Sequence, residues 1–288
     1  QVLNNPLFFN TGKLDERWII MDKIIGFIGA GNMGQAMAGG IVSSGIVKAE
    51  NIIFSDISEE NLKKAYKKYG VRTSNSNVLT ASMADFLVLS VKPHLYQTVI
   101  EEIKDYLKPE TVVITIAAGI TLEKLKNMFG KDIKTVRTMP NTPAMAGEGM
   151  TAVIPNEFIT ENELKEVMEI LNSFGKAEII EEKLIDAVIA VSGSSPAYVY
   201  MMIEAMGDAA VAGGMAREKA YKFAAQAVLG SAKMVLETGI HPGELKDMVC
   251  SPGGTTIEAV AALEENGFRS AIIKAMKICE EKSKEMSK

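Results

Sequence analysis

A glycine-rich turn between an apolar segment and a run of small residues limits what this chain can fold into more than any other feature. Residues 23–28 (KIIGFI) have the length and apolar character of a buried strand, and residues 29–34 (GAGNMG) carry the spacing G-x-G-x-x-G. In dinucleotide-binding proteins the three glycines allow a tight turn, close approach of backbone to a pyrophosphate, and close packing of helix on strand. The free N–H groups at the start of the following helix would face the phosphates. The pattern predicts a dinucleotide site; a glycine-rich turn without a ligand is the alternative.

The next predicted strand ends in a carboxylate. Residues 51–54 read as a strand that runs into Ser55 and Asp56, and a charged helix follows from about Ser58 to Tyr69. A carboxylate after the second strand can accept hydrogen bonds from the adenosine ribose and repel a 2′-phosphate. The alternative is that Asp56 merely caps the following helix.

Two more apolar segments end in loops that we expect to face a ligand. Residues 85–91 read as a buried parallel strand that runs into Lys92 and Pro93, and residues 111–116 end in Ala-Ala-Gly at 117–119. Ligands bind beyond the carboxyl ends of such strands, so Val91, Lys92 and Pro93 should face the cofactor. The small residues at 117–119 leave room for a flat ring, or serve only tight packing.

The order of segments predicts an α/β fold followed by an all-helical half. Strand 136–138 runs into the irregular loop MPNTP, and helix 161–173 and strand 177–180 complete an alternation of strands and helices. That alternation predicts an N-terminal Rossmann-type doubly wound sheet over residues 21–183. Residues 184–288 show no strand pattern, so we expect a helical dimerisation and substrate-binding domain.

Within the helical half, composition predicts close contacts between helices. Residues 196–215 are dense in Ala and Gly, which lets helices approach closely, and 217–237 continue as an amphipathic helix. His241 is expected only to start a short helix. The last helix, from about Phe268, ends in a Lys- and Glu-rich tail that we expect to be a solvated face.

Composition excludes several classes of function. The chain has 47% hydrophobic and 23% charged residues and a net charge of −5, which is globular and argues against a nucleic-acid partner. Two histidines, and two cysteines without metal-ligand spacing, argue against a metal site and suit a reducing cytoplasm. No apolar run reaches the roughly 20 residues of a membrane span, so we expect a cytoplasmic protein that does not contact a membrane.

Residues 1–20 stand apart from the rest. Met21 precedes the first strand as a natural start would, and the segment lacks the basic and apolar regions of a secretory signal. We expect an artificial or read-through extension there.

Three sequence motifs together resemble the pyrroline-5-carboxylate reductase family. They are GFIGAGNMG at 26–34, VSGSSPAY at 191–198 and SPGGTT at 251–256, and the VKP and MPNTP turns fit as well. The likeness runs from Met21 to the C-terminus. One position departs from the family, which usually has glycine where Ser195 stands.

The resemblance implies a reductase that passes hydride from NADPH or NADH to the C=N bond of 1-pyrroline-5-carboxylate and gives L-proline. It also implies a Rossmann domain, a helical domain that intertwines with its twin, a homodimer and a possible larger ring of dimers. The cofactor positions that match the family are Gly29, Ala30, Gly31, Asn32, Met33 and Gly34 at the phosphates, Asn77 near the adenosine, and Val91, Lys92, Pro93, Ala117, Ala118 and Gly119 near the nicotinamide.

The substrate positions that match the family are Ser251, Gly253, Gly254, Thr255 and Thr256, with Thr256 beside the ring nitrogen. The chemistry agrees with this implication. A glycine-rich loop at a helix N-terminus offers N–H groups to a carboxylate without needing Arg or Lys. The cofactor carries the difficult step, so a chain without the usual His or Cys catalysts is sufficient.

Two other functions remain open from the sequence. A β-hydroxyacid dehydrogenase has a similar opening motif, but those enzymes resemble one another in a Lys followed four residues later by Asn, and here Lys233 is followed by Glu237. The other is a nucleotide-sensing dimer without catalysis. The SPGGTT motif argues against it, because a sensor needs no second pocket that binds a carboxylate.

Overall fold

A computed structural model describes residues 21–287, with side-chain surroundings through residue 286. The expected extension at 1–20 lies outside these residues. The described chain divides into two compact units. One, here called the sheet unit, holds 21–196 and the C-terminal segment from Lys277; the other, the helical unit, is Ala197–Met276.

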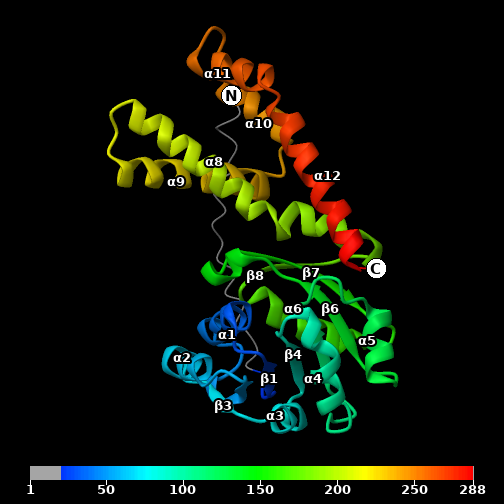
Figure 1. The fold of residues 1–288 in the computed structure, drawn as a ribbon. Helices are drawn as coiled ribbons and strands as arrows, with labels where there is room; N and C mark the ends of the chain where they lie inside the picture. Colours follow the sequence, from blue (N-terminus) through cyan, green and yellow to red (C-terminus); the bar gives the residue numbers. More distant parts are fainter. Residues whose placement is uncertain (1–20, 288) are drawn as a thin grey trace. The chain divides into compact units, whose positions relative to one another are not determined.

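The sheet unit is built on an eight-stranded sheet (Figure 1). Its strands are β1 (Ile25–Ile28), β2 (Ile52–Ser55), β3 (Arg72–Ser74), β4 (Phe86–Leu89), β5 (Val112–Thr115), β6 (Thr135–Met139), β7 (Gly149–Pro155) and β8 (Gly175–Ile179). They lie in the order β3-β2-β1-β4-β5-β6-β7-β8, and all neighbouring pairs are parallel except β6 and β7. The first six follow the order of doubly wound dinucleotide-binding sheets. The predicted fold class is confirmed.

Helices cover both faces of this sheet. They are α1 (Asn32–Ser44), α2 (Glu59–Tyr69), α3 (Asn77–Met83), α4 (Tyr96–Ile103), α5 (Leu122–Phe129), α6 (Glu161–Asn172) and α7 (Ile185–Val188). Short 3₁₀ turns are η3 (Ala49–Asn51), η4 (Pro93–Leu95), η5 (Thr142–Ala146) and η6 (Glu182–Leu184), and η7 (Ile189–Gly193) is a π-helical turn. The second predicted helix has its expected ends, with Ser58 as N-cap and Gly70 in the left-handed conformation after its last residue.

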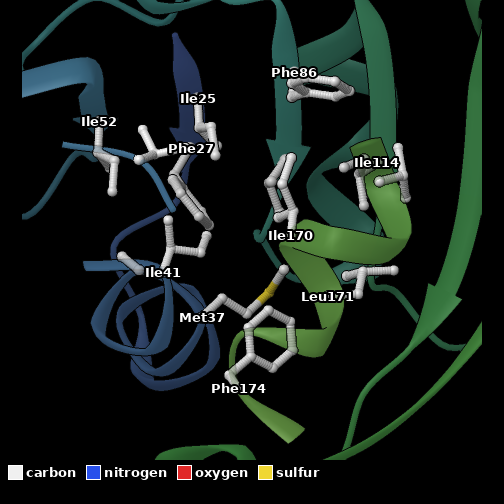
Figure 2. Close-up of a cluster of buried hydrophobic side chains, with 14 of the residues drawn as sticks. Ile25, Phe27, Met37, Ile41, Ile52, Phe86, Ile114, Ile170, Leu171 and Phe174 are labelled. Atoms are coloured by element: carbon white, nitrogen blue, oxygen red, sulfur yellow. The ribbon is translucent and has the colours of Figure 1, made fainter. Parts of the chain in front are cut away.

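The strands read as continuous apolar runs because each face of the sheet has its own core. On one face Phe27 stacks on Phe54, with ring centroids 4.6 Å apart. Figure 2 shows Met37 of α1 and Ile170 of α6 packed on this same face. On the other face Ile28 packs with residues of β4, α4 and β5. Alternate residues of one strand therefore enter different cores.

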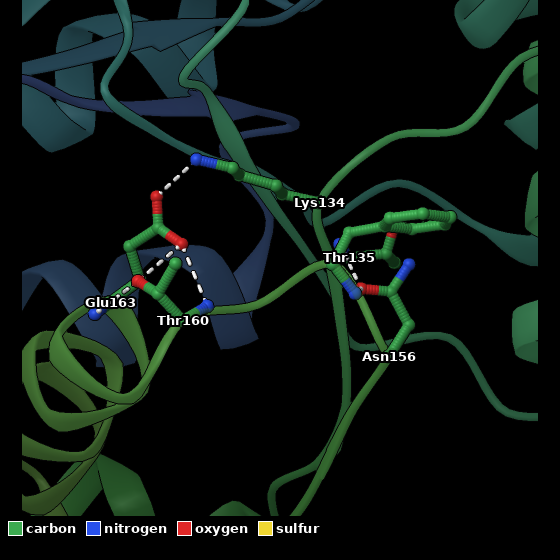
Figure 3. Close-up of polar contacts among 6 residues, drawn as sticks. Lys134, Thr135, Asn156, Thr160 and Glu163 are labelled. Atoms are coloured by element: carbon green, nitrogen blue, oxygen red, sulfur yellow. Dashed lines mark hydrogen bonds and ion pairs between the residues drawn. The ribbon is translucent and has the colours of Figure 1, made fainter.

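Helix α6 is fastened to the start of β6 (Figure 3). Thr160 caps the helix and accepts from the N–H of Glu163, while the Glu163 carboxylate accepts from the Thr160 N–H at 3.0 Å. The other oxygen of Glu163 accepts from Lys134 Nζ at 2.5 Å. Nearby, Asn156 Oδ1 accepts the N–H of Thr135 at 3.2 Å. One carboxylate thus serves both a helix start and an ion pair with Lys134, the residue just before β6.

Two strands were missed in the sequence. β3 has the polar sequence Arg-Thr-Ser at the sheet edge, with only β2 as a neighbour, so it shows no apolar run. β7 follows the MPNTP loop and the short turn η5, and it returns antiparallel to β6. No α-helix separates β6 from β7, so the alternation of strands and helices did not predict β7.

The helical unit consists of helices, as predicted. α8 (Ser195–Ala212) leads into it, and α9 (Arg217–Thr238), α10 (Pro242–Val249), α11 (Thr255–Glu265) and α12 (Phe268–Ser287) follow. Gly207 of α8 lies so close to α9 that an added Cβ would sit 2.5 Å from the ring of Tyr221. Small residues therefore do allow close helix contacts here. His241 starts α10, accepting the Gly243 N–H at Nδ1, 3.1 Å away.

The expectation that the C-terminal tail is only a solvated face is wrong. Ser283 is buried and donates to Asp186 Oδ1 at 2.5 Å. Cys279 donates through Sγ to Ser194 Oγ at 3.2 Å and packs with Ile189. Both partners lie at least 85 positions earlier in the chain, so no local pattern could reveal them.

One helical stretch, Glu182–Ala212, is long and apolar enough by length and composition to cross a membrane. Counting uninterrupted apolar residues in the sequence missed it, because scattered polar residues break the run. Only 17% of its most apolar window is buried within the chain.

Candidate active site

The glycine-rich turn joins β1 to α1 beside the point where strand order reverses, between β1 and β4. Gly29 has φ +104°, and an added Cβ would lie 2.7 Å from the Ser90 carbonyl oxygen. A Cβ on Gly34 would lie 2.8 Å from the Gly29 carbonyl oxygen. A Cβ on Gly31 would meet nothing within 4 Å. Gly29 and Gly34 therefore allow close packing of the backbone. Gly31 faces open space, where no side chain covers the backbone.

The start of α1 is open to an anion. Its N-cap is Gly31, which provides no side-chain hydrogen bond to the first turn. The N–H groups of a first helical turn have no partner within the helix and attract negative charge. The bare turn and the uncapped helix together fit the pyrophosphate of a dinucleotide.

Two side chains that were not predicted from the sequence stabilise this turn by donating hydrogen bonds to its carbonyl groups. Ser90 Oγ donates to the Gly29 carbonyl at 2.6 Å, and Gln35 Nε2 donates to the Ala30 carbonyl at 2.7 Å. Ser90 follows β4, so only the pairing of β1 with β4 brings it here. The sequence signal was weak: a hydroxyl at the end of a buried strand.

Asp56 also holds the turn. Its Oδ2 accepts the N–H of Ala30 at 2.6 Å, and its Oδ1 accepts the N–H of Ser58 at 2.7 Å. The N-cap of α2 is Ser58, not Asp56. The carboxylate thus lies against the glycine-rich turn, and its contact with a ribose stays a prediction.

Asn77 is the first residue of α3, the helix that follows β3. Its Nδ2 donates to Glu102 Oε2 at 2.8 Å; Asn77 is half-buried and Glu102 is exposed. The preceding residue, Ser76, caps the helix. The Asn77 amide is accordingly available at the surface, held by a neighbouring acid.

The loops after β4 and β5 lie at the same edge of the sheet, because the two strands are parallel neighbours. Val91 is half-buried and Lys92 and Pro93 are exposed. Ala117 is buried, and Gly119 has φ +77° with its α-carbon so close to the end of α12 that a Cβ would lie 3.0 Å from the Met286 carbonyl oxygen. For Gly119 close packing is therefore a sufficient explanation.

The buried side chain of Tyr96 connects the ends of β4 and β5. Its hydroxyl lies 2.6 Å from the Leu89 carbonyl oxygen and 2.7 Å from Thr115 Oγ1. Burial raises the pKa of Tyr96 well above its usual value of about 10. The phenol stays neutral and holds the ends of β4 and β5 at a set spacing.

Two of the sequence motifs meet through Asn141. This buried residue of the MPNTP loop donates from Nδ2 to the Ser192 carbonyl at 2.9 Å and accepts the Met150 N–H at 2.8 Å. Ser192 lies in the π-helical turn, where the Ser194 N–H reaches back to the Ile189 carbonyl. π-turns often mark functional sites. The sequence indicated polar groups in this loop without naming their partner.

The SPGGTT segment forms a turn and a helix start within the helical unit. The Gly254 N–H donates to the Ser251 carbonyl at 3.0 Å, and Gly253 has φ +64°. Gly254 is the N-cap of α11 and supplies no side-chain hydrogen bond, so Thr255 and Thr256 open the helix uncapped. A Cβ on Gly254 would collide with Ser251 Oγ. This second open helix start fits a small carboxylate.

Residues 21–287 contain no group of three or more His, Cys, Asp or Glu side chains that could hold a metal ion. Both cysteines in this range are free thiols.

Two family models match the chain. Residues 182–286 match the family described as pyrroline-5-carboxylate reductase dimerisation, and residues 24–119 match the one described as NADP oxidoreductase, coenzyme F420-dependent. The pyrroline-5-carboxylate reductase of Escherichia coli K12 is 53% identical over 268 residues, covering 93% of this chain and 100% of that protein. The chain belongs to the pyrroline-5-carboxylate reductase family.

Solved structures agree with this membership. The pyrroline-5-carboxylate reductase of Coxiella burnetii has a TM-score of 0.86 at 36% identity, covering 92% of this chain and 99% of that one. The Plasmodium falciparum enzyme, solved with NADP bound, has a TM-score of 0.84 at 36% identity, covering 93% and 99%. The resemblance that the motifs indicated is confirmed for nearly the whole chain. The roles of individual site residues stay predictions.

Proposed function

We propose that this chain is a pyrroline-5-carboxylate reductase that transfers hydride from NADPH or NADH to the C=N bond of 1-pyrroline-5-carboxylate and forms L-proline. The observation that carries the proposal is the likeness over 93% of the chain to a reductase of the same name, 53% identical and matched along its full length. The two open helix starts, one in each unit, supply the anion sites that such a reaction needs.

The sheet unit would hold the dinucleotide, and residues 21–183 form its domain in this proposal. The bare backbone at Gly31 and the first turn of α1 would bind the pyrophosphate, with Asp56 at the ribose. When bound, the reduced nicotinamide supplies the hydride. The residues that we propose as cofactor contacts are Gly29, Ala30, Gly31, Asn32, Met33, Gly34, Asp56, Asn77, Val91, Lys92, Pro93, Ala117, Ala118 and Gly119.

The SPGGTT turn would hold the substrate. The uncapped start of α11 offers backbone N–H groups to the substrate carboxylate, and Ser251 adds a hydroxyl donor. Thr256, one position further into the helix than Thr255, would place its hydroxyl at the ring nitrogen. In this proposal the protein binds and orients the substrate. Gly253 and Gly254 keep the turn free of side chains at these two positions.

The protein is a homodimer in this proposal, formed through residues 184–288. Only Gly207, Ala220 and Ala224 are buried within Ala197–Met276. Several large apolar side chains there are more than half exposed: Tyr200, Met201, Phe223, Leu229, Leu236 and Val249. Tyr200 and Met201 also line a groove of about 500 Å³ between α8 and α9. A unit with so little core requires a partner surface.

The match of 182–286 to a dimerisation family supports a second copy as that partner. The apolar stretch Glu182–Ala212 would then be covered by protein and not by lipid, in a cytoplasmic enzyme. Dimers could further assemble into a ring, which sedimentation of the active enzyme would measure.

The test follows nicotinamide absorbance with two substrate classes in parallel: 1-pyrroline-5-carboxylate with NADH or NADPH, and β-hydroxyacids with the oxidised cofactor. Loss of reduced cofactor with 1-pyrroline-5-carboxylate, and appearance of an equal amount of L-proline, is the expected result. Turnover only with β-hydroxyacids in the reverse direction would favour a hydroxyacid dehydrogenase. Binding of the dinucleotide without turnover of either substrate would favour a sensor.

A further inference from the structure

The carboxylate of Asp56 cannot easily turn away from a ligand at the glycine-rich turn. Each of its oxygens accepts a backbone N–H, Oδ2 from Ala30 at 2.6 Å and Oδ1 from Ser58 at 2.7 Å. The two donors belong to different segments, the β1–α1 turn and the β2–α2 turn. Rotation of the side chain would break both part-buried hydrogen bonds and leave the two N–H groups without these partners.

The β2–α2 turn offers no cation that could offset this charge. Between Asp56 and Asn61 the chain reads Ile-Ser-Glu-Glu, so the two nearest charged side chains are also acids. The first lysines of α2 are already paired: Lys63 with Glu59 at 3.2 Å and Lys64 with Glu60 at 2.6 Å. A phosphate monoester carries about −1.5 to −2 charges at neutral pH. It would therefore meet a fixed carboxylate inside an acidic turn.

From this geometry we infer that Asp56 makes the enzyme select NADH over NADPH. The inference rests on the proposed function and settles which of its two cofactors the site prefers. A ribose 2′-hydroxyl can donate to the fixed carboxylate, whereas a 2′-phosphate brings like charge and no donor. The hydrogen bond from the Ala30 N–H gives the same carboxylate a second role, because it stabilises the glycine-rich turn that would hold the pyrophosphate.

The two roles separate in a binding experiment that needs no substrate. Dissociation constants for NADH and for NADPH are measured by nicotinamide fluorescence with the full chain and with Asp56→Asn. Loss of the hydrogen bond between Asp56 and the Ala30 N–H should weaken the binding of both dinucleotides equally. Loss of the charge should change only the ratio of the two dissociation constants.

We expect the full chain to bind NADH at least about tenfold more tightly than NADPH. Asp56→Asn should lower that preference about tenfold or more, within the roughly 10- to 150-fold range of one hydrogen bond to a charged group. Asp56→Ser, which removes the charge and shortens the side chain, should move the ratio the same way. Asp105→Asn makes the same chemical change at an exposed carboxylate of the sheet unit and should leave the ratio unchanged.

Equal weakening of both dinucleotides by Asp56→Asn would overturn the inference and leave Asp56 only its role in stabilising the glycine-rich turn. A full chain that prefers NADPH would overturn it as well. If the full chain bound neither dinucleotide, the proposed function would fail, which the wild-type titration shows before any variant is compared.

Discussion

At the residue scale, the proposed reaction depends on what the Thr256 hydroxyl does at the ring nitrogen. As a general acid it would contribute roughly 10²- to 10⁴-fold in rate. If the substrate binds already protonated as the iminium, Thr256 only accepts its N–H. One hydrogen bond to a charged group contributes about 1.5–3 kcal/mol, or roughly 10- to 150-fold. Threonine is a poor acid, so we favour the second role.

The first prediction is that Thr256→Val lowers kcat/KM by roughly 10- to 150-fold, the range of one hydrogen bond. Thr256→Ser, which keeps the hydroxyl, should restore most of the activity. The rate of all three should fall as pH rises and the iminium is depleted. A loss beyond about a thousandfold would point to an acid, and no loss would remove Thr256 from the site.

Tyr96 shows how a residue away from the ligand can hold the site edge. Tyr96→Phe would leave the Leu89 carbonyl without its donor and Thr115 Oγ1 without this hydrogen-bond partner, at a cost of about 1–3 kcal/mol in unfolding free energy. Burial raises the pKa of Tyr96, so the stability it contributes is complete below about pH 10. That stability falls as pH rises from there through the folded pKa.

We therefore expect wild type and Tyr96→Phe to differ most at neutral pH, and the difference to shrink above about pH 10. Urea unfolding at pH 7 and above pH 10 measures it. Tyr106→Phe, the same change at an exposed tyrosine, is the control and should be near neutral. A difference between wild type and Tyr96→Phe that grows with pH would contradict the assignment.

At the element scale, the start of α6 depends on Glu163. Burial by itself would raise the pKa of this carboxyl, but Lys134 and Thr160 together outweigh burial and hold the pKa below its usual value. A lowered folded pKa stabilises the protein above the unfolded value of about 4.3. The stabilisation is lost as pH falls through the folded pKa.

Glu163→Gln should lower the unfolding free energy at pH 7 by about 1–2 kcal/mol, the cost of a weakened cap and ion pair. The difference from wild type should shrink as pH falls below about 4. Glu161→Gln, at an exposed acid of the same first turn, is the matched control. A deficit that persists unchanged in acid would show that charge is not the cause.

At the scale of the whole molecule, the helical unit makes the enzyme dependent on its partner. Phe223→Glu places a charge among exposed apolar side chains that we propose lie in the dimer interface. A buried unpaired charge costs several kcal/mol, so the dimer should dissociate at least about a hundredfold more easily. Sedimentation would detect the monomer, and the activity should fall with it.

The control is Tyr66→Glu, the same type of change at an exposed aromatic residue of α2 in the sheet unit. It should stay dimeric and active. Wild type that sediments as a stable monomer at micromolar concentration with full activity would defeat the dimer proposal. Phe223→Glu that remains as tightly dimeric as wild type would place Phe223 outside the interface.

Local patterns in the sequence determined the elements whose signals are local. The glycine-rich turn, the apolar strands 23–28, 85–91 and 111–116, and the Ser58 and Gly70 ends of α2 all follow from neighbouring residues. Each depends on backbone conformation or on a run of apolar side chains. The family was likewise readable from short motifs. The predicted boundary between 183 and 184 and the site roles stay predictions.

Tertiary structure alone decided which side chains support the site. Ser90 and Asp56 reach the glycine-rich turn because parallel pairing places the ends of β4 and β2 beside the end of β1. The edge strand β3, the antiparallel β7 and the docked end of α12 share the same cause. Their partners are distant in sequence. The contacts form only when the chain folds, and they hold these segments in place despite their polar or charged composition. No short stretch of neighbouring residues therefore predicts them.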